Sequence, residues 1–264
     1  MQPSEDTVLS PADMKKAIAE EAVNRFIKDG MVVGLGTGST AYFAIMKIGE
    51  LVSSGYDLTC VATSVQSEKL AKSCGIDVLD LDDIDSIDVT IDGADEVDPQ
   101  MQIIKGLGGA LLREKIVAAA TVKEVIVVGD NKIVDRLGTT CPLPVEVLPF
   151  GHRHTSRALR KLGCEPVLRM NGDAPFITDS GNCIYDCRFD GIDRPYYLEM
   201  AINNITGVVE NGLFLNTAYE VLVCDRHGRI TAMAESVNEK LAGKDIRVFR
   251  RRTSSSRPHP RPLL

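Results

Sequence analysis

Residues 31–40 read MVVGLGTGST, a short apolar run with glycines at every second position and then two hydroxyl residues. The apolar run predicts a buried strand, Met31–Leu35, and the residues from Ser39 to about Val52 predict the helix that follows it. Glycines let the backbone approach a ligand closely, and a helix N-terminus favours an anion by about 0.3–2 kcal/mol. The stretch therefore predicts an anion-binding turn between a strand and a helix.

Two common nucleotide-binding motifs do not fit this turn. The dinucleotide pattern GxGxxG needs its third glycine at Ser39, and the next predicted strand ends at Thr63-Ser64 rather than at an acidic residue. A phosphate-binding loop of the Walker type would need Gly-Lys-Ser/Thr, which does not follow. A small phosphate monoester is the ligand that the residues favour. A glycine turn capped by Ser39, with no ligand, is the alternative.

Strands and helices alternate outward from this turn. Before it, Ser10-Pro11 is typical of a helix start and Gly30 of a helix end. After it, the predicted strands are 58–63, 76–79, 87–91 and 125–128, and the predicted helices are 65–74 and 109–120. This alternation predicts an α/β fold, with a mostly parallel sheet covered by helices on both faces.

The pattern changes near Cys141-Pro142-Leu143-Pro144. Beyond it we expect strand 145–148, helix 154–162, strands 165–170 and 182–189, helix 195–202 and a strand at 207–209. This strand-helix-strand-strand-helix-strand order predicts a smaller α+β (ferredoxin-like) unit. The last predicted strands, 213–215, 220–224 and 229–232, are expected to return to the first sheet.

We therefore expect three parts. Residues 1–140 form the larger domain, completed by residues 213–236, and residues 141–212 form the small α+β domain. Residues 237–264 form a C-terminal extension. Its tail from Arg251, RRTSSSRPHPRPLL, is rich in Arg, Ser and Pro, a composition that predicts disorder.

Composition narrows the classes of function. The chain has 264 residues and a net charge of −7, and its last 18 residues hold six arginines and no acid, so the preceding body is more acidic still. Such a body argues against nucleic-acid binding. No apolar run of about 18 residues predicts a membrane span, and the first ten residues do not resemble a secretory signal. The seven scattered cysteines predict reduced thiols, so we expect a cytoplasmic protein.

Two carboxylates follow a predicted strand in the segment Asp88–Glu96, DVTIDGADE. Ligands of parallel sheets bind at the carboxyl ends of the strands, which is where Asp92 and Asp95 lie, on either side of Gly93-Ala94. We expect the two carboxylates to hydrogen-bond a polyol or to transfer its protons. A solvated loop and a magnesium site are the alternatives.

A lysine leads a second glycine-rich turn in Lys105–Lys115, KGLGGALLREK, and a helix begins there. Glu114 lies about one turn into that helix and could face the same cavity as the other two loops. A carboxylate beside Lys105 and a glycine-lined oxyanion pocket suits the removal of a proton next to a carbonyl. The alternative is a solvated helix face. Lys132 follows a further strand, where it could neutralise substrate charge or lie on the surface. No Ser/His or Cys/His catalytic pattern occurs.

Together these segments resemble the ribose-5-phosphate isomerase A family. GLGTGST, DGADE, KGLGGALLREK and PLPVEVLPF occur in the family's order and at about its separations, and the likeness covers about residues 11–236. The resemblance implies a Rossmann-like domain with a smaller α+β domain, usually in homodimers or homotetramers. It implies interconversion of D-ribose 5-phosphate and D-ribulose 5-phosphate through a cis-enediol(ate) in the non-oxidative pentose phosphate pathway, without metal or cofactor.

The resemblance also implies roles for single residues. Glu114 matches the general base, Asp92 and Asp95 match carboxylates that hold sugar hydroxyls and assist ring opening, and Lys105 matches the lysine that stabilises the oxyanion. Many members of the family have glycine where this chain has Leu107. The expected substrate-binding residues are Thr37, Gly38, Ser39, Thr40, Gly93, Ala94, Gly106, Leu107, Gly108, Lys132 and Lys15.

Three other functions are open on related folds. A non-catalytic sugar-phosphate-sensing domain would need a helix-turn-helix, whereas one helix precedes the first predicted strand. A sugar-phosphate deaminase or a CoA-transferase with a glutamate nucleophile would share the architecture. The pairing of DGADE with KGLGGALLREK argues against both.

Overall fold

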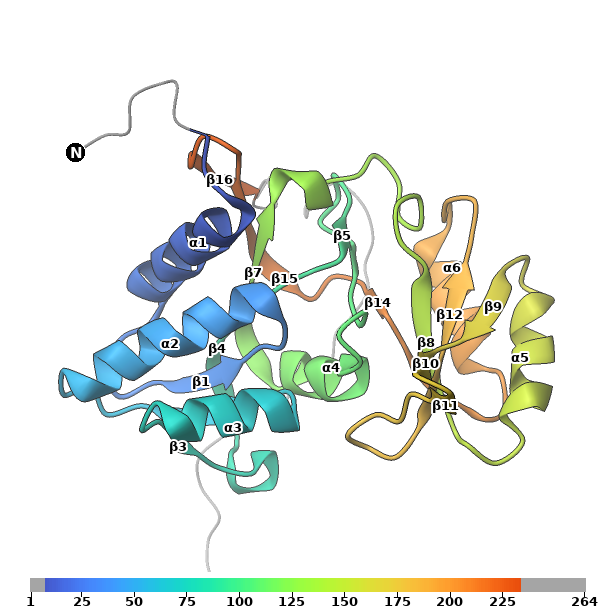
Figure 1. Cartoon of the computed structure of the whole chain (residues 1–264), viewed down its shortest axis with the longest axis horizontal. Coiled ribbons are helices and arrows are strands. Elements are labelled where there is room, and N and C mark those ends of the chain that lie inside the picture. The colour runs from blue at the N-terminus through green and yellow to red at the C-terminus, as the bar shows by residue number, and fades with distance from the viewer. Residues whose placement is uncertain (1–7, 234–264) are drawn as a thin grey trace, which may run out of the picture.

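The computed structural model describes residues 8–233 of the chain. Its largest element is a seven-stranded sheet in the order β16-β15-β7-β4-β1-β2-β3 (Figure 1). These strands are β1 (Val32–Leu35), β2 (Thr59–Ala62), β3 (Asp77–Val78), β4 (Ile87–Asp92), β7 (Thr121–Gly129), β15 (Ala218–Cys224) and β16 (Ile230–Met233). All neighbours run parallel except β15 and β16. The prediction of a mostly parallel sheet is confirmed.

Helices cover both faces of this sheet. The helices are α1 (Pro11–Phe26), α2 (Ser39–Ser53), α3 (Val65–Ser73) and α4 (Leu111–Ala119). Val125 and Val127 of β7 share a core with residues of α1 and α2, whereas Ile126 shares one with Ala118 of α4. Because alternate side chains of a strand point to opposite faces, α4 lies on the face away from α1 and α2.

The second half of the chain forms a four-stranded antiparallel sheet in the order β13-β8-β12-β9. Its elements are β8 (Leu143–Val147), α5 (His152–Arg160), β9 (Glu165–Leu168), β12 (Cys183–Arg188), α6 (Pro195–Asn203) and β13 (Val208–Asn211). Numbered along the chain, the strand order is 4-1-3-2, the ferredoxin-like arrangement, so this prediction is also confirmed. A hairpin of β10 (Met170–Asn171) and β11 (Ala174–Pro175) extends from it.

A small three-stranded sheet lies between these two parts. It consists of β5 (Glu96–Val97), β6 (Ile103–Ile104) and β14 (Leu213–Phe214). The buried Glu96 carboxylate accepts hydrogen bonds from the backbone of Gly138, Thr140 and Cys141 and from the Thr140 hydroxyl, at 2.5–2.8 Å. It thereby fixes the segment that leads into β8. Strands β5 and β6 were not predicted. Strand β14 falls in the predicted strand 213–215, but it pairs with β6 in this small sheet and does not return to the seven-stranded sheet, which was the expectation.

Two element boundaries differ from the expected ones, one because of a glycine conformation and one because two strands pair over a longer range. Helix α4 begins at Leu111 rather than Gly109, because Gly109 adopts φ +84° and belongs to the preceding turn. Strand β7 begins four residues earlier than predicted, since Thr121–Glu124 pair with β4. The expected domain boundaries stay a prediction, and residues 234–264, with the expected extension and tail, lie outside the described residues.

Candidate active site

The predicted loops meet around one cavity of about 470 Å³ at the carboxyl ends of β1, β4 and β7. Thirteen of the fifteen predicted site residues line it, and Asp92 and Leu107 do not. Asp92 is 1% exposed and lies behind the wall, whereas the side chain of Leu107 is among the exposed ones. The sheet therefore brings together segments far apart in the sequence, as the strand-end argument predicted. The roles of these residues stay predictions.

The first wall is the turn between β1 and α2. Thr37 N–H donates to Asp92 Oδ1 at 3.0 Å, and the Thr37 hydroxyl lies 2.7 Å from that of Thr63. Gly36 leaves no space for a side chain, because a Cβ there would lie 2.3 Å from Asp92 Oδ1. No side chain caps α2, so the N–H groups of its first turn remain available where Ser39 and Thr40 line the cavity. This end of the helix can receive an anion.

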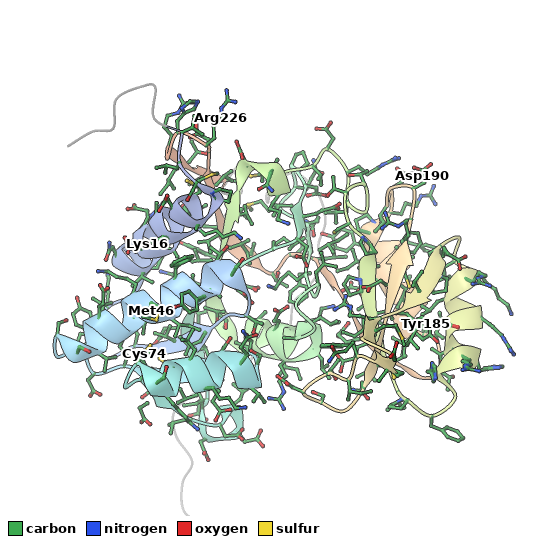
Figure 2. The ribbon with its side chains drawn as sticks, in the orientation of Figure 1. Lys16, Met46, Cys74, Tyr185, Asp190 and Arg226 are labelled. Carbon is green, nitrogen blue, oxygen red and sulfur yellow. The ribbon has the colours of Figure 1, made fainter. Side chains whose placement is uncertain are left out.

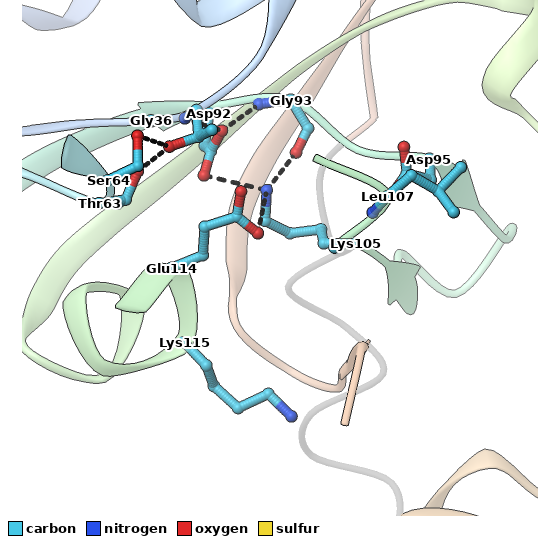
Figure 3. A network of polar contacts seen from close by, with 12 residues as sticks. Gly36, Thr63, Ser64, Asp92, Gly93, Asp95, Lys105, Leu107, Glu114 and Lys115 are labelled. Carbon is cyan, nitrogen blue, oxygen red and sulfur yellow. Dashed lines mark hydrogen bonds and ion pairs between the residues drawn. The ribbon is translucent and has the colours of Figure 1, made fainter. Parts of the chain in front are cut away.

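The second wall is formed by Lys105 and Glu114, which belong to a buried cluster of one lysine and two carboxylates (Figure 3). Lys105 Nζ lies 2.9 Å from Asp92 Oδ2 and 3.6 Å from Glu114 Oε2, and it donates to Gly93 O at 2.6 Å. The three charged side chains are at most 4% exposed. Lys115, the next residue of α4, extends away from the cluster and binds Glu210 instead (Figure 3). The Lys105 ammonium therefore lies where developing negative charge on a substrate oxygen would be stabilised.

Burial shifts the titration of this cluster. Desolvation raises the pKa of Glu114 to about 8; Lys105 opposes this shift, while Asp92 and Asp95 add to it. Glu114 Oε2 has no hydrogen-bond partner among the described residues. Burial alone would lower the pKa of Lys105, but the Asp92 and Glu114 carboxylates outweigh it and raise that pKa. A carboxyl that titrates near neutrality beside a permanent cation is suited to accept and return a proton.

Asp95 and the glycine turn after Lys105 form the third wall. Asp95 Oδ2 accepts a hydrogen bond from Leu107 N–H at 2.9 Å, and Asp95 lines the cavity. Leu107 therefore contributes its backbone to the site while its side chain lies outside the cavity wall. Leucine in place of glycine at position 107 therefore does not reduce the space inside the cavity.

Cations also lie along the cavity at the level of α1 and β7. Lys15 comes from α1 and Lys132 from the short 3-10 helix Asp130–Lys132 that follows β7. Neither lies within 4.0 Å of a carboxylate in residues 8–233. Arg226, which was not predicted, also lines the cavity from the turn after β15, beside the start of α1 (Figure 2). Its position after the last parallel strand was a usable signal.

Glu124 is a second residue near the site that was not predicted from the sequence. This residue pairs with Thr90 across β7 and β4 and is 2% exposed, and its Oε2 has no hydrogen-bond partner among residues 8–233. Burial raises the pKa of Glu124 to about 7, against the attraction of Lys105 and with the repulsion of Asp92. A glutamate directly before the apolar run Val125–Val128 was the signal, but it fell outside the predicted strand.

No group of three or more His, Cys, Asp or Glu side chains that could hold a metal ion occurs within residues 8–233. In the same part of the chain, no helix has the length and apolar character needed to cross a bilayer.

Replacing Glu124 by glutamine should change how stability depends on pH. The ordinary pKa of the carboxyl is 4.5, and in the folded chain it is about 7. Between these values the folded state holds a proton that the unfolded state releases, so the unfolding free energy falls as pH rises. Glu124→Gln removes this contribution, and the variant should gain stability over the wild type as pH increases from 4.5 to 8. Urea unfolding at both pH values measures the gain.

The control for this experiment is Glu50→Gln, which removes the same charge from an exposed side chain. It should keep the wild-type fall in stability. A difference between Glu124→Gln and wild type that is equal at both pH values would contradict the raised pKa.

Known proteins of one family are similar to this chain. Residues 59–228 match the family model of ribose 5-phosphate isomerase A (phosphoriboisomerase A). The chain is 50% identical over 214 residues to a ribose-5-phosphate isomerase A of Thermosynechococcus vestitus, covering 80% of this chain and 90% of the relative.

Solved structures give the same result. A D-ribose-5-phosphate isomerase in complex with phospho-erythronic acid is 41% identical, with a TM-score of 0.83 over 86% of this chain and 100% of its own. The ribose 5-phosphate isomerase A of Methanocaldococcus jannaschii is 40% identical, with a TM-score of 0.81 over the same shares. By sequence and by structure, this chain belongs to the ribose-5-phosphate isomerase A family.

Proposed function

We propose that the chain interconverts D-ribose 5-phosphate and D-ribulose 5-phosphate, with Glu114 as the general base. The observation that carries the proposal is the buried Glu114 carboxylate at the wall of the cavity, 3.6 Å from Lys105 Nζ. Family membership supports the reaction type, and the cluster supports the assignment of the base. A proton must leave one carbon of an aldose and reach its neighbour, and a single carboxylate can do both.

The reaction begins with the opening of the furanose ring, in which Asp95 or Asp92 handles the ring-oxygen and hydroxyl protons. Asp95 lines the cavity, whereas Asp92 lies behind Lys105, so Asp95 is the better placed of the two. We assign Asp92 the role of holding Lys105 and the turn at Thr37, through its two carboxylate oxygens.

Proton transfer follows in the open-chain aldose. Glu114 removes the C2 proton, the C2–H electron pair forms the C1–C2 double bond, and the carbonyl oxygen at C1 gains negative charge. Lys105 and backbone N–H groups of the glycine turn stabilise this oxygen. Glu114 then returns the proton to C1 of the cis-enediol(ate). The proton of the C2 hydroxyl moves to the C1 oxygen, so that C2 becomes the ketone and C1 carries the alcohol. C1 and C2 are adjacent on one face, so the same carboxylate serves both.

Binding of the phosphate supplies the orientation. The uncapped start of α2, with Ser39 and Thr40, receives the phosphate, and Lys15 and Lys132 add positive charge. Gly38, Gly93, Ala94, Gly106 and Gly108 form the backbone surface against which the sugar lies. Interactions at the far end of the substrate hold the reacting carbons against Glu114.

The proposed chemistry needs neither metal nor cofactor, since proton transfer and charge stabilisation come from side chains and backbone. We place the reaction in the non-oxidative pentose phosphate pathway, in a cytoplasmic homodimer or homotetramer. A sugar-phosphate sensor, a deaminase and a CoA-transferase are the alternatives.

One assay separates these possibilities. Purified chain is incubated with D-ribose 5-phosphate, and ketose formation is followed by absorbance, before and after exhaustive treatment with a chelator. We expect ribulose 5-phosphate in both cases. Binding without turnover would favour the sensor, and activity restored only by a divalent ion would overturn the metal-free mechanism.

Glu114→Gln should abolish most of the turnover while the protein stays folded. The amide fills the same space but cannot accept the proton, and a general base contributes about 10²–10⁴ in rate. We expect kcat to fall by at least about a hundredfold. Glu220→Gln is the matched control, because Glu220 is also buried but pairs with Arg25 outside the cavity. A kcat of Glu114→Gln within threefold of wild type would remove Glu114 from this role.

The double substitution Ser39→Ala and Thr40→Ala should raise KM for phosphorylated substrate. Two hydroxyls would be lost at the predicted phosphate site, whereas the catalytic cluster stays intact. Ser54→Ala, at the opposite end of α2, is the control and should leave KM unchanged. Steady-state kinetics with ribose 5-phosphate decide the outcome; an unchanged KM in the double variant would place the phosphate elsewhere.

A further inference from the structure

The glycine turn of the active site is held from the ferredoxin-like unit by one arginine. Arg169 follows β9, and its Nη1 donates to Gly106 O at 3.0 Å and to Leu107 O at 3.1 Å. On its other edge, Nε donates to Asp186 Oδ2 at 2.9 Å, and Nη2 donates to Asp186 Oδ1. The arginine side chain is 13% exposed. Asp186 of β12 thus fixes the guanidinium, which in turn holds two successive carbonyl groups.

The glycine turn that Arg169 holds has little conformational order of its own. Gly106 and Gly109 adopt φ +107° and +84°, conformations that favour glycine, and such residues lose more conformational entropy on ordering than any other. Phe176 of the same unit, whose N–H donates to Arg169 O at 2.9 Å, packs against Gly109, and the Arg169 guanidinium lies 5.8 Å from the centre of its ring. The order of the turn therefore comes largely from outside it.

The N–H groups of the same two peptides lie on the side opposite to their carbonyl groups, toward Asp95 and the cavity. In a trans peptide the C=O and the following N–H point in opposite directions. The peptide whose carbonyl is Gly106 O carries the Leu107 N–H, which donates to Asp95 Oδ2 at 2.9 Å. The peptide whose carbonyl is Leu107 O carries the Gly108 N–H. Gly108 lines the cavity, and its N–H has no hydrogen-bond partner within residues 8–233.

We propose that Arg169, fixed by Asp186, is a positioning residue for the isomerisation: it aims the Gly108 N–H at the substrate oxygen and holds Asp95 through Leu107. The positive charge on the carbonyl side also polarises both peptides, so that their N–H groups become stronger donors. Donors fixed before the reaction stabilise developing charge without reorganisation. The proposal rests on the isomerase function proposed above, and Arg169 acts through the turn rather than by touching substrate.

A second arginine in the same part of the chain provides a matched control. Arg136 Nη1 pairs with Asp193 at 2.9 Å, and its Nη2 donates to Asp190 O at 3.2 Å, so it also joins a carboxylate to a backbone carbonyl. Its contacts are with the loop before α6 and not with the glycine turn. Substituting Arg136 therefore shows the effect of losing an arginine that joins a carboxylate to a carbonyl, without an effect on the glycine turn.

The experiment compares Arg169→Ala, Arg169→Lys, Asp186→Asn and Arg136→Ala with wild type in steady-state kinetics on ribose 5-phosphate. Removing a single oxyanion donor costs about 10²–10³ in kcat, and misplacing one should cost less. We expect kcat of Arg169→Ala to fall roughly tenfold to a hundredfold with KM within threefold of wild type. Arg169→Lys, which keeps one charged donor, should recover part of the loss. Asp186→Asn should be intermediate, and Arg136→Ala should match wild type.

A binding measurement separates positioning from a structural role. Phospho-erythronic acid, the ligand in a related structure, carries a planar carboxylate that resembles the enediolate oxygens. Its affinity, measured by calorimetry, should fall in Arg169→Ala by a factor close to the fall in kcat. A merely structural role would lower the melting temperature without moving affinity and kcat together.

The outcomes are distinct. If wild type does not isomerise ribose 5-phosphate, the proposed function is wrong and the role of Arg169 falls with it. If wild type is active and Arg169→Ala keeps kcat within threefold, only the positioning role is wrong. Should Arg169→Ala not fold, Arg169→Lys and Asp186→Asn decide: full activity in both would overturn the proposal.

Discussion

The structure depends on one buried ammonium group, that of Lys105. Its Nζ lies 2.9 Å from Asp92 Oδ2 and 3.6 Å from Glu114 Oε2, and its charge also acts to lower the pKa of Glu124. Burying an ionised carboxylate without a partner is costly, and one cation cannot neutralise three. Burial is the largest cause that raises the pKa of Glu114 to about 8 and that of Glu124 to about 7; Lys105 opposes both shifts, and repulsion from Asp92 adds to them. Burial, together with a surplus of carboxylates over cations, thus gives a glutamate whose pKa suits proton exchange.

The parallel sheet makes this cluster possible because it gathers strand ends. Asp92 ends β4, and the turn at Thr37 follows the adjacent strand β1. Gly36 allows that turn to approach the Asp92 carboxylate, where any side chain would collide. Helix α4 packs on the face toward which Asp92 points and delivers Glu114 from its first turn. The end of β4, the turn after β1 and the first turn of α4 each form locally, but the site requires all three to lie together.

The ferredoxin-like part contributes to the site without lining it. Arg169 reaches the glycine turn, and Asp179 accepts a hydrogen bond from Val65 N–H at 2.8 Å, at the start of α3. Glu96, on the other side, binds the backbone that leads into β8. The two parts are therefore tied together by polar contacts, of which those of Glu96 and Arg169 are buried or half-buried. A residue in the second part can influence catalysis through these contacts, as proposed for Arg169.

The sequence by itself determined the alternation of strands and helices, the ferredoxin-like order of the second half and the three loops of the site. These follow from hydrophobic periodicity, glycine and capping residues, which act over a few neighbouring positions. Only the tertiary structure decided that Asp92 lies behind the cavity wall, that Leu107 contributes its backbone alone, and that Glu124, Arg169 and Arg226 lie at or around the site. Their positions depend on strand register and on contacts between segments far apart in the sequence, such as the one between Leu9 and Arg226. The pKa values depend on burial, which no local pattern encodes.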